Sequence, residues 1–467
     1  MNWLRCIAAV NLCLIRFWVE LFAYTPWPAH RNFNPPQSFD FLSTAILCLL
    51  LGTVLYGIVL KTSLLARMTA VAVLLVLLLK EAFLAASNLR WFYRGDWIGS
   101  FKWMAIAAVL FSLTILAARF GMHNEARMNR LTRTIAGALL PFAALTLGQA
   151  FWNSVFLIDK SVASSALQPR ASAAVAGKRV VWILFDELDE RIAFSQRPAG
   201  FRLPALDQFR TEANFVATHA SSPYNATVNS IPALLSANLL AKENRLEDTI
   251  LHRLTARGIQ TAVVGWAIPY CPELGANVAD CVWQPIAQQH NSYGSGLSLL
   301  NRARSLFESN HLSPFGQSLA VQHHVEQVED LTRAAIKAAA RPDLQFVFLH
   351  LPHAHNPFVW DPETQRPILA PHPRDPRGYL RNLHWADAAF ARIRLAMENA
   401  GIWERSVVLV SADHGFRDAD ALGYSKDDLH VPFLLKSPSG GVDDLDPQAP
   451  FETIQSADLL LKLMLRH

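Results

Sequence analysis

The stretch RVVWILFDE, residues 179–187, decides the fold of the larger part of this 467-residue chain. Its apolar and β-branched run, residues 179–185, is typical of a strand that is covered on both faces. Further strands are predicted at residues 261–266, 344–353, 406–415 and 430–436. Helical periodicity lies between them, for example at residues 246–258 and 385–401. Alternation of strand and helix predicts an α/β domain with a parallel, doubly wound sheet.

Polar side chains follow three of these strands directly. Asp186 and Glu187 come after the first strand, His353 ends the third, and Asp413 and His414 lie at the end of the fourth. Open α/β sheets bind ligands beyond the carboxyl ends of their strands, so these residues are expected to form one site. Carboxylates with imidazoles are a ligand set that suits zinc or manganese. The sequence therefore predicts a divalent-metal site with one or two ions, most readily Zn and alternatively Mn.

A nucleophile is predicted in the segment SSPYNATVNSIPALLSANLL, residues 221–240. The apolar run from Ile231 onward predicts a helix, with Pro232 tolerated in its first turn. Thr227 lies just before this helix or at its start, where free backbone N–H groups favour an anion. A nearby metal would lower the pKa of the Thr227 hydroxyl and make it a nucleophile. The local pattern also fits a simple helix cap by Thr227, Asn229 or Ser230.

The first 157 residues are dominated by long apolar runs, and 52% of the whole chain is hydrophobic. A membrane-spanning helix needs about 20 mostly apolar residues. Five such helices are predicted, at residues 4–24, 39–60, 67–86, 101–120 and 134–157. More spans follow the first one and no small-residue cleavage site is present, so the first run is not expected to be a cleaved signal peptide. Residues 1–157 are therefore predicted to form a five-helix transmembrane domain.

Lysine and arginine in the short loops predict the orientation in the membrane. With the N-terminus in the cytoplasm, the inner loops hold Arg5, Lys61, Arg67, Arg119, Arg127, Arg130 and Arg133, and the outer loops hold Arg31, Arg90 and Arg94. This bias favours a cytoplasmic N-terminus, and five spans then place the rest of the chain on the outer side. The sequence thus predicts a multi-pass protein of the bacterial inner membrane with a periplasmic domain at residues 179–467.

A linker and a cysteine pair are predicted beyond the membrane half, and the cysteine pair agrees with an outer location. Residues 158–178, rich in alanine and serine, are expected to be a linker. Cys271 and Cys281 are the two cysteines of the globular half, and they are predicted to form a disulfide, as is common in oxidising compartments. The net charge of +4 is small, so no nucleic-acid partner is expected.

Taken in order, the segments VVWILFDE, LPALDQFRTEANFVATHASS, NATVNSIPALLS, FLHLPHAHNPF, SADHG and HVPF resemble the alkaline phosphatase superfamily. The similarity is strongest to its sulfatase-like membrane branch, which includes lipid A phosphoethanolamine transferases and lipoteichoic acid synthases. It covers most of residues 178–467. The resemblance implies an alkaline-phosphatase-like catalytic domain behind a membrane anchor.

The resemblance also implies roles for particular residues. Thr227 would be the nucleophile, and Asp413 and His414 would bind a metal that also contacts Thr227. The acidic ligand on the first strand would be Asp186 by comparison with sulfatases, or Glu187 by comparison with the lipid A transferases. Asp186 is preferred as the main ligand, and Glu187 is kept with it.

Histidines complete the implied site. His353 matches the histidine that contacts the transferred group, with His350 and His355 as weaker alternatives, and His430 precedes VPF where the branch often has a site histidine. The chain departs from the family in two places. It has no Cys-x-Pro-x-Arg motif, so formylglycine chemistry is excluded, and Phe416 and Arg417 follow the DHG segment where the transferases often have Glu-Ser.

These features predict a phospho-group transferase that acts through a covalent phospho-threonine. Its expected partners are a phospholipid or other phosphodiester donor, an acceptor lipid or glycan of the cell envelope, and the membrane itself. A phosphodiesterase or phosphatase of the same fold, with water as acceptor, is the alternative. A non-catalytic envelope protein that retains the fold is a third possibility.

Overall fold

The structure is a computed structural model of the whole chain. It describes residues 3–14, 18, 38–61, 130, 133–134, 137–156, 178–241, 245–284, 316–368, 375–438 and 440–465. Contacts divide the chain into two compact units. One contains the N-terminal helices, and the other contains the sheet and its helices.

The N-terminal unit has three described helices of more than one turn, α1 (Trp3–Cys13), α3 (Ser38–Lys61) and α7 (Leu140–Phe156). Helices α1 and α7 both pack against α3. Gly52 brings α1 and α3 close together, because a Cβ at this position would lie 2.7 Å from Cγ1 of Ile7. Such contact through a small residue is common between membrane helices.

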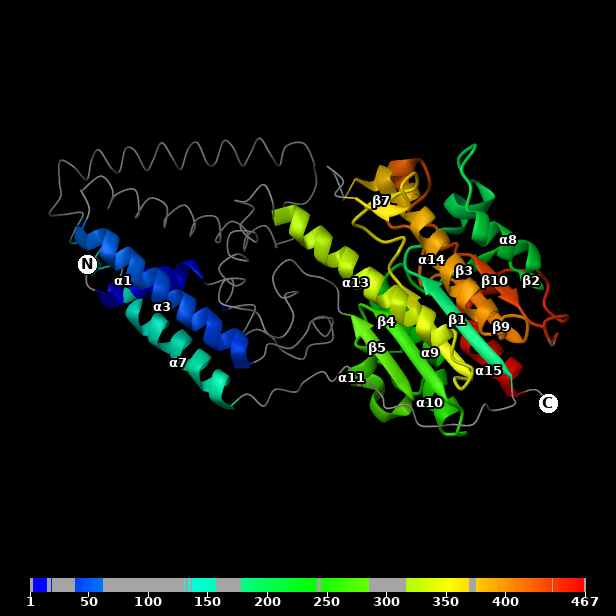
Figure 1. Cartoon of the computed structure of the whole chain (residues 1–467), viewed down its shortest axis with the longest axis horizontal. Helices are drawn as coiled ribbons and strands as arrows, with labels where there is room; N and C mark the ends of the chain where they lie inside the picture. The colour runs from blue at the N-terminus through cyan, green and yellow to red at the C-terminus, as the bar shows by residue number, and fades with distance from the viewer. Residues whose placement is uncertain are drawn as a thin grey trace. The chain divides into compact units, whose positions relative to one another are not determined.

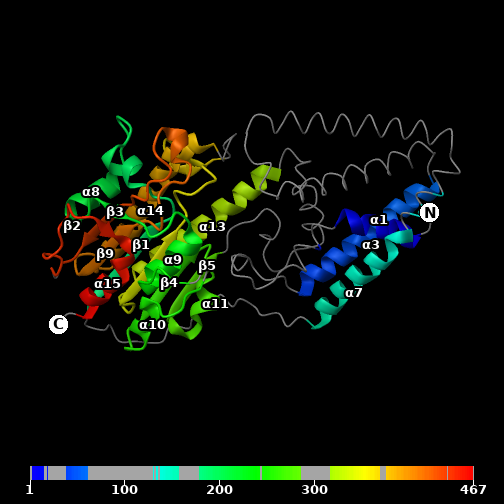
Figure 2. The same ribbon diagram turned by 180° about the vertical axis from the view of Figure 1, so that it is seen from behind.

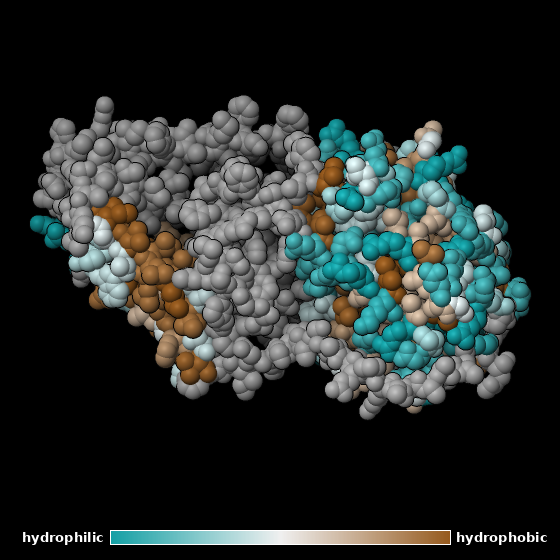
Figure 3. Space-filling model, viewed as in Figure 1, coloured by the Kyte–Doolittle hydropathy of each residue, from teal (hydrophilic) through white to brown (hydrophobic). Residues whose placement is uncertain are grey.

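Large apolar side chains cover the outside of these helices (Figure 3). The exposed ones on α3 and α7 are Leu42, Ile46, Leu49, Leu50, Leu51, Val54, Leu145, Phe151, Trp152 and Val155. An apolar surface made of many exposed side chains on neighbouring helices is typical of contact with a membrane or with a partner. Among the described residues, one helix is long and apolar enough to cross a membrane, the stretch Phe41–Ile58 within α3.

Two other predicted spans are only partly matched by described helices. The described helix in the first span, α1, has 11 residues, and the one in the fifth, α7, has 17. The third and fourth predicted spans and the linker lie outside the described residues. The five-helix bundle and the boundaries at residues 157 and 178 therefore stay predictions.

The second unit is built on a seven-stranded sheet with the order β2-β10-β9-β1-β6-β4-β5. Its strands are β1 (Arg179–Phe185), β2 (Phe215–Val216), β4 (Thr261–Trp266), β5 (Asp280–Gln284), β6 (Phe346–Leu351), β9 (Ser406–Ser411) and β10 (Phe433–Lys436). Two small two-stranded sheets accompany it, β3 (Ala220–Ser221) with β11 (Phe451–Glu452) and β7 (Trp360–Asp361) with β8 (Arg366–Pro367).

Five neighbouring strands of the large sheet are parallel, from β9 through β1, β6 and β4 to β5. Strand β10 runs antiparallel to both β9 and β2, so the prediction of an entirely parallel sheet is wrong at this edge. A parallel neighbour needs a crossover connection, usually a helix. Residues 412–432 between β9 and β10 contain only the short 3-10 helix Ala419–Leu422, and the chain turns back instead.

Helices cover both faces of the sheet (Figures 1 and 2). They are α8 (Pro204–Glu212), α13 (Gly316–Ala339) and α14 (Tyr379–Asn399) on one face, and α9 (Thr227–Ser236), α10 (Ile250–Thr255) and α15 (Ser456–Leu465) on the other. The odd-numbered residues 181–185 of β1 pack into the first core and the even-numbered residues 180–184 into the second. The doubly wound α/β architecture is confirmed, and β1 lies in its buried centre.

Candidate active site

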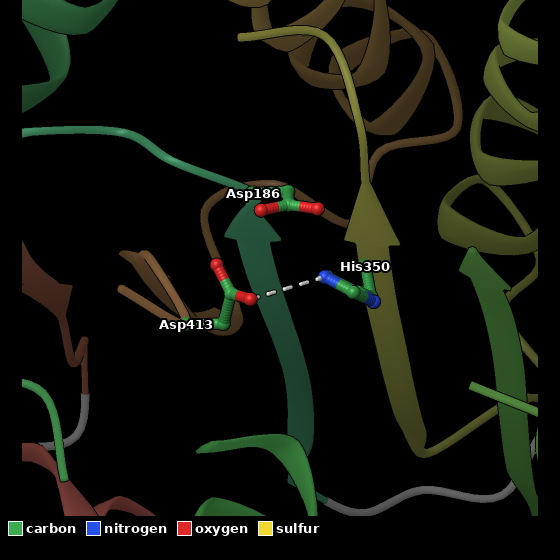
Figure 4. A group of neighbouring side chains, drawn as sticks. All are labelled: Asp186, His350 and Asp413. Carbon is green, nitrogen blue, oxygen red and sulfur yellow. Dashed lines mark ion pairs between the residues drawn. The ribbon is translucent and has the colours of Figure 1, made fainter. Parts of the chain in front are cut away.

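Asp186, His350 and Asp413 meet at the carboxyl ends of the central strands (Figure 4). Asp186 follows β1, Asp413 lies two residues beyond β9, and His350 is the next-to-last residue of β6, which pairs with β1. Each offers one ligand atom, and these atoms all lie within 4.8 Å of one another. Parallel pairing of β9, β1 and β6 brings these distant parts of the sequence to one edge, as the sequence predicted for the two aspartates.

The three side chains are fully buried, and several of their polar atoms have no hydrogen-bond partner among the described residues. These atoms are both carboxylate oxygens of Asp186, Oδ2 of Asp413 and Nε2 of His350. Buried charges are normally paired or bound to a metal. The Nε2 atom of His350 lies 3.9 Å from Oδ2 of Asp413, too far for a hydrogen bond. The cluster therefore fits a divalent cation, and its oxygen and nitrogen donors suit zinc or manganese.

Protonation of the cluster supports the same assignment. Burial, followed by the charges of Asp413 and Glu187, raises the pKa of Asp186 well above its ordinary value. For Asp413, burial acts upward, but His414, His350 and the Thr227 hydroxyl together hold its pKa below the ordinary value. Burial lowers the pKa of His350 to about 4, so its ring is neutral near pH 7, which is the form that binds metals. A bound cation would act in the opposite direction and favour the charged form of Asp186.

His414 lies beside this cluster with its Nε2 atom directed inward. Its Nδ1 atom is 2.8 Å from the carbonyl oxygen of Gly415, which can only accept, so Nδ1 carries the proton. Nε2 therefore has a free electron pair, and it lies 3.6 Å from Oδ1 of Asp186 and 3.5 Å from Oδ2 of Asp413. His414 can thus serve as a metal ligand or accept a proton.

Thr227 is the first residue of α9, and its hydroxyl oxygen lies 3.2 Å from Nε2 of His414. Ala226 before it is extended, and its carbonyl oxygen accepts bonds from the backbone N–H groups of Asn229 and Ser230. The Thr227 hydroxyl therefore sits at the positive end of a ten-residue helix, where a developing anion is stabilised. The structure brings Thr227 to His414 and to Asp413.

Glu187 lies at the border of the cluster in a strained conformation. Its φ angle of 63° is in the left-handed region, which is rare for residues other than glycine and is found at functional sites. Its carbonyl oxygen accepts a hydrogen bond from the Tyr379 hydroxyl at 2.6 Å, and its side-chain Oε1 lies 2.5 Å from Nε of Arg417. The other carboxylate oxygen, Oε2, is buried without a hydrogen-bond partner among the described residues.

Arg417 links Glu187 to His355. Its terminal nitrogen lies 2.9 Å from Nε2 of His355, and its side chain is about half exposed. Burial alone would lower the pKa of Arg417, but Glu187 and then Asp186 raise it above its ordinary value. This guanidinium is therefore a permanent positive charge beside the buried carboxylates.

The structure does not bring His353 to the cluster. Its Nε2 atom bonds to the hydroxyl of Thr332 on α13 at 2.9 Å, and its ring packs edge-on against Phe185 and Trp385. Burial lowers its pKa to about 3, so it stays neutral. Of the two weaker alternatives, His350 belongs to the cluster with Asp186 and Asp413, and His355 contacts Arg417.

His430 occupies an intermediate place. Its Nδ1 atom bonds to Asp428, its side chain is 37% exposed, and its ring lies 6.1 Å from that of His219. The backbone at His430 is close to the DHG segment, because a Cβ at Gly415 would lie 3.3 Å from the carbonyl oxygen of His430. His430 is therefore a partly exposed histidine whose backbone lies close to the DHG segment.

One residue of the site has no counterpart in the sequence analysis. The Tyr270 hydroxyl lies 2.9 Å from Nδ1 of His350. Burial, followed by Asp413 and Asp186, raises the pKa of Tyr270 well above its ordinary value, so the phenol keeps its proton. Tyr270 is next to Cys271, whose predicted disulfide with Cys281 is confirmed.

The chain matches one family model and has similarity to several solved structures. The family model described as Sulfatase matches residues 178–464. Among solved structures, Ps i-CgsB in complex with k-i-k-neocarrahexaose is similar at 11% identity and a TM-score of 0.45, covering 62% of this chain and 72% of that chain. The lipoteichoic acid synthase LtaP from Listeria monocytogenes is similar at 17% identity and a TM-score of 0.39, with the same coverage of 62% and 72%.

A third similar structure is the phosphonate monoester hydrolase SpPMH from Silicibacter pomeroyi, at 14% identity and a TM-score of 0.41. Here 62% of this chain and 73% of that chain are covered. No curated protein matches the chain.

Proposed function

Because the chain belongs to the sulfatase family, we propose that it is a membrane-anchored, metal-dependent phospho-group transferase that acts through a covalent phospho-threonine at Thr227. One observation carries the proposal. The hydroxyl of Thr227, at the start of a helix, lies 3.2 Å from Nε2 of His414, which in turn faces two buried aspartates. A hydroxyl nucleophile, a proton acceptor and a cation site are the parts that such a transfer requires.

The residues that would hold the cation are Asp186, Asp413 and His350, with His414, Glu187 and the Thr227 hydroxyl beside them. When bound, a divalent cation lowers the pKa of a coordinated hydroxyl and stabilises negative charge on phosphoryl oxygens. Zinc is favoured and manganese is the alternative, with one or two ions.

In the first step, the Thr227 oxygen attacks the phosphorus of a phosphodiester. The bond between Thr227 and phosphorus forms, the ester bond to the leaving alcohol breaks, and the Thr227 proton passes to a nearby base such as His414. The departing oxygen takes a proton from His430, whose side chain is 37% exposed. The helix end at Thr227 and the Arg417 charge stabilise the transferred anion.

In the second step, a hydroxyl of an acceptor attacks the phospho-threonine. The acceptor loses its proton to the histidine that gave one up in the first step. The bond between phosphorus and the Thr227 oxygen breaks, and Thr227 takes back its proton from the base that accepted it. Cell-envelope lipid or glycan is the proposed acceptor, and a phospholipid is the proposed donor. The apolar surface of α3 and α7 supports a lipid donor, since an anchor holds the chain where lipids are abundant.

The disulfide between Cys271 and Cys281 supports an oxidising location for the sheet domain. Together with the loop charges, it favours a protein of the inner membrane with a cytoplasmic N-terminus and a periplasmic catalytic domain.

A phosphodiesterase or phosphatase is the second candidate. The partly exposed side chain of Thr227 favours it, because solvent that reaches this residue can also reach the phospho-threonine. The chemistry up to the phospho-threonine is the same, and water replaces the acceptor hydroxyl.

The test uses the purified full-length chain with zinc or manganese and a phospholipid labelled in its headgroup. Mass spectrometry of the protein should find the label on Thr227, and the label should pass to envelope glycolipid when this is added. Label that appears only in free phosphate ester identifies the hydrolase. A wild-type chain that binds neither metal and never carries label at Thr227 would instead support a non-catalytic envelope protein.

A further inference from the structure

The ring of His350 is held from its outer side by two groups. Its Nδ1 atom lies 2.9 Å from the Tyr270 hydroxyl and 3.1 Å from the carbonyl oxygen of Trp266. Since the carbonyl can only accept, the ring proton belongs on Nδ1. Nε2 then carries the free electron pair, and it is the atom that faces Asp413. Metal-binding histidines generally have such a partner on the other ring nitrogen.

Tyr270 is itself fixed against the sheet. It is fully buried, and its ring lies close to Gly265 in β4. A Cβ at Gly265 would lie 2.2 Å from two ring carbons of Tyr270, so no larger residue leaves room for the ring. The ring also contacts that of Phe348 on β6, with centroids 5.8 Å apart. The absence of a side chain at Gly265 thus leaves the space that the Tyr270 ring occupies when its hydroxyl contacts His350.

The disulfide secures the same segment. Tyr270 begins the short helix α11 (Tyr270–Leu274), and the next residue, Cys271, is bonded to Cys281 on β5. Cys281 pairs with Val263 of β4, so the bond ties α11 to the edge of the sheet that carries Gly265. A five-residue helix has little stability of its own and depends on tertiary contacts. The covalent link is therefore placed to keep Tyr270 in position.

We propose that Tyr270 is a positioning residue for the metal site, and that the Cys271–Cys281 disulfide holds it there. The Tyr270 hydroxyl keeps Nε2 of His350 directed at the cation between Asp186 and Asp413. The affinity for the cation then depends on the disulfide, so the site is assembled fully only in an oxidising compartment. This inference rests on the metal site of the proposed function.

The first test compares Tyr270→Phe with wild type in the purified full-length chain. Phenylalanine keeps the ring on Gly265 and removes only the hydroxyl. The Kd for Mn²⁺, measured by electron paramagnetic resonance of the free ion, should rise about 10- to 100-fold. The visible spectrum of the Co²⁺-loaded chain should shift, because the donor geometry at the metal changes. Tyr424→Phe is the matched control, since it removes a hydroxyl that bonds to the Gln196 carbonyl oxygen instead.

The second test needs no substitution at Tyr270. Reduction of the wild-type disulfide should raise the Kd for Mn²⁺ by about tenfold or more, whereas the same treatment of a C271S/C281S chain should change nothing. Loss of the Tyr270 hydroxyl and loss of the disulfide both act through His350. Reduction should therefore increase the Kd for Mn²⁺ little further in the Tyr270→Phe chain. If that variant does not fold, reduction of the wild type still tests whether the disulfide supports the metal site.

The outcomes separate this inference from the proposed function. A Tyr270→Phe chain with wild-type Kd and an unchanged Co²⁺ spectrum overturns the role of Tyr270. A reduced wild-type chain with unchanged Kd overturns the role of the disulfide. If an Asp413→Ala chain also binds Mn²⁺ normally, the metal site itself has been assigned to the wrong residues and the proposed function fails with it.

Discussion

The hydroxyl oxygen of Thr227 and Nε2 of His414 lie 3.2 Å apart, although 187 residues separate them in the sequence. His414 donates from Nδ1 to the carbonyl oxygen of Gly415, which leaves Nε2 to accept from Thr227. The contact joins the start of α9 to the segment after β9. Such a contact between a hydroxyl and a proton acceptor is what the proposed attack by Thr227 requires.

The first prediction concerns Thr227. Replacing it with alanine removes the nucleophile, so turnover of a phosphodiester should fall on the order of 10³-fold or more. The buried aspartates and His350 are untouched, so Mn²⁺ binding should stay within a few-fold of wild type. Thr227→Ser is the matched control and should retain measurable turnover. An alanine chain that turns over substrate at the wild-type rate would remove Thr227 from the mechanism.

The second prediction concerns the metal ligands. Asp413→Asn should abolish tight Zn²⁺ or Mn²⁺ binding, because a neutral amide replaces a carboxylate between two buried partners. His353→Gln should leave the metal content unchanged, because that side chain bonds to Thr332 outside the cluster. Metal analysis of the purified chains after dialysis measures both. Loss of metal in the His353 variant together with retention in the Asp413 variant would reverse the assignment.

The third prediction concerns Arg417. Removing its guanidinium in Arg417→Ala should raise KM for an anionic substrate more than it lowers kcat, since the charge lies beside Glu187 at the edge of the cluster. Mn²⁺ binding should not weaken, because a positive charge near the site is lost. Lys426→Ala is the control, since it removes an exposed cation that faces Asp420. Steady-state kinetics at constant ionic strength tests this, and an unchanged KM would contradict it.

Much of this site could be predicted from the sequence, because the carboxyl ends of neighbouring parallel strands lie at the same edge of the sheet. Asp186 and Asp413 come after apolar runs that predict strands, and this rule was enough to place them together at the site. The position of Thr227 could be predicted only approximately, because the apolar run placed the helix from Ile231 with Pro232 in its first turn, whereas α9 begins at Thr227 and has Pro232 as its sixth residue. The disulfide was predictable because Cys271 and Cys281 are the two cysteines of the globular half.

The histidines of FLHLPHAHNPF could not be assigned in the same way. His350, His353 and His355 lie within six residues, and their directions depend on where β6 ends. The strand ends at Leu351, so His350 still lies within β6, where side chains point alternately to the two faces of the sheet. Its side chain lies on the face where it contacts the Tyr270 hydroxyl. His353 lies beyond the strand and turns into the core under α13. The place of Tyr270 depended on contact with Gly265, which local patterns do not reveal.

Asp387 provides a pH-dependent contact away from the site. Its carboxylate on α14 accepts hydrogen bonds from the backbone N–H groups of Ala205 and Leu206, at 3.3 and 2.8 Å, in the first turn of α8. Burial, together with the nearby charge of Asp207, raises its pKa from 3.8 to about 6, although the two N–H groups act in the opposite direction. The folded chain therefore binds more protons at Asp387 than the unfolded chain between about pH 4 and pH 6.

The fourth prediction follows from the sign of this shift. The stabilisation that goes with protonated Asp387 is fully present below about pH 3.8 and is lost as the pH rises through about 6. Two pKa units correspond to about 3 kcal/mol at most. Asp387→Asn cannot ionise, so its free energy of unfolding relative to wild type should increase by up to that amount between pH 4 and pH 7. Urea unfolding of the full-length chain in detergent, followed by tryptophan fluorescence, measures the difference. Asp444→Asn at an exposed position should show no such trend. A difference between wild type and Asp387→Asn that stays constant across this range would show that Asp387 titrates in the folded chain as it does in the unfolded one.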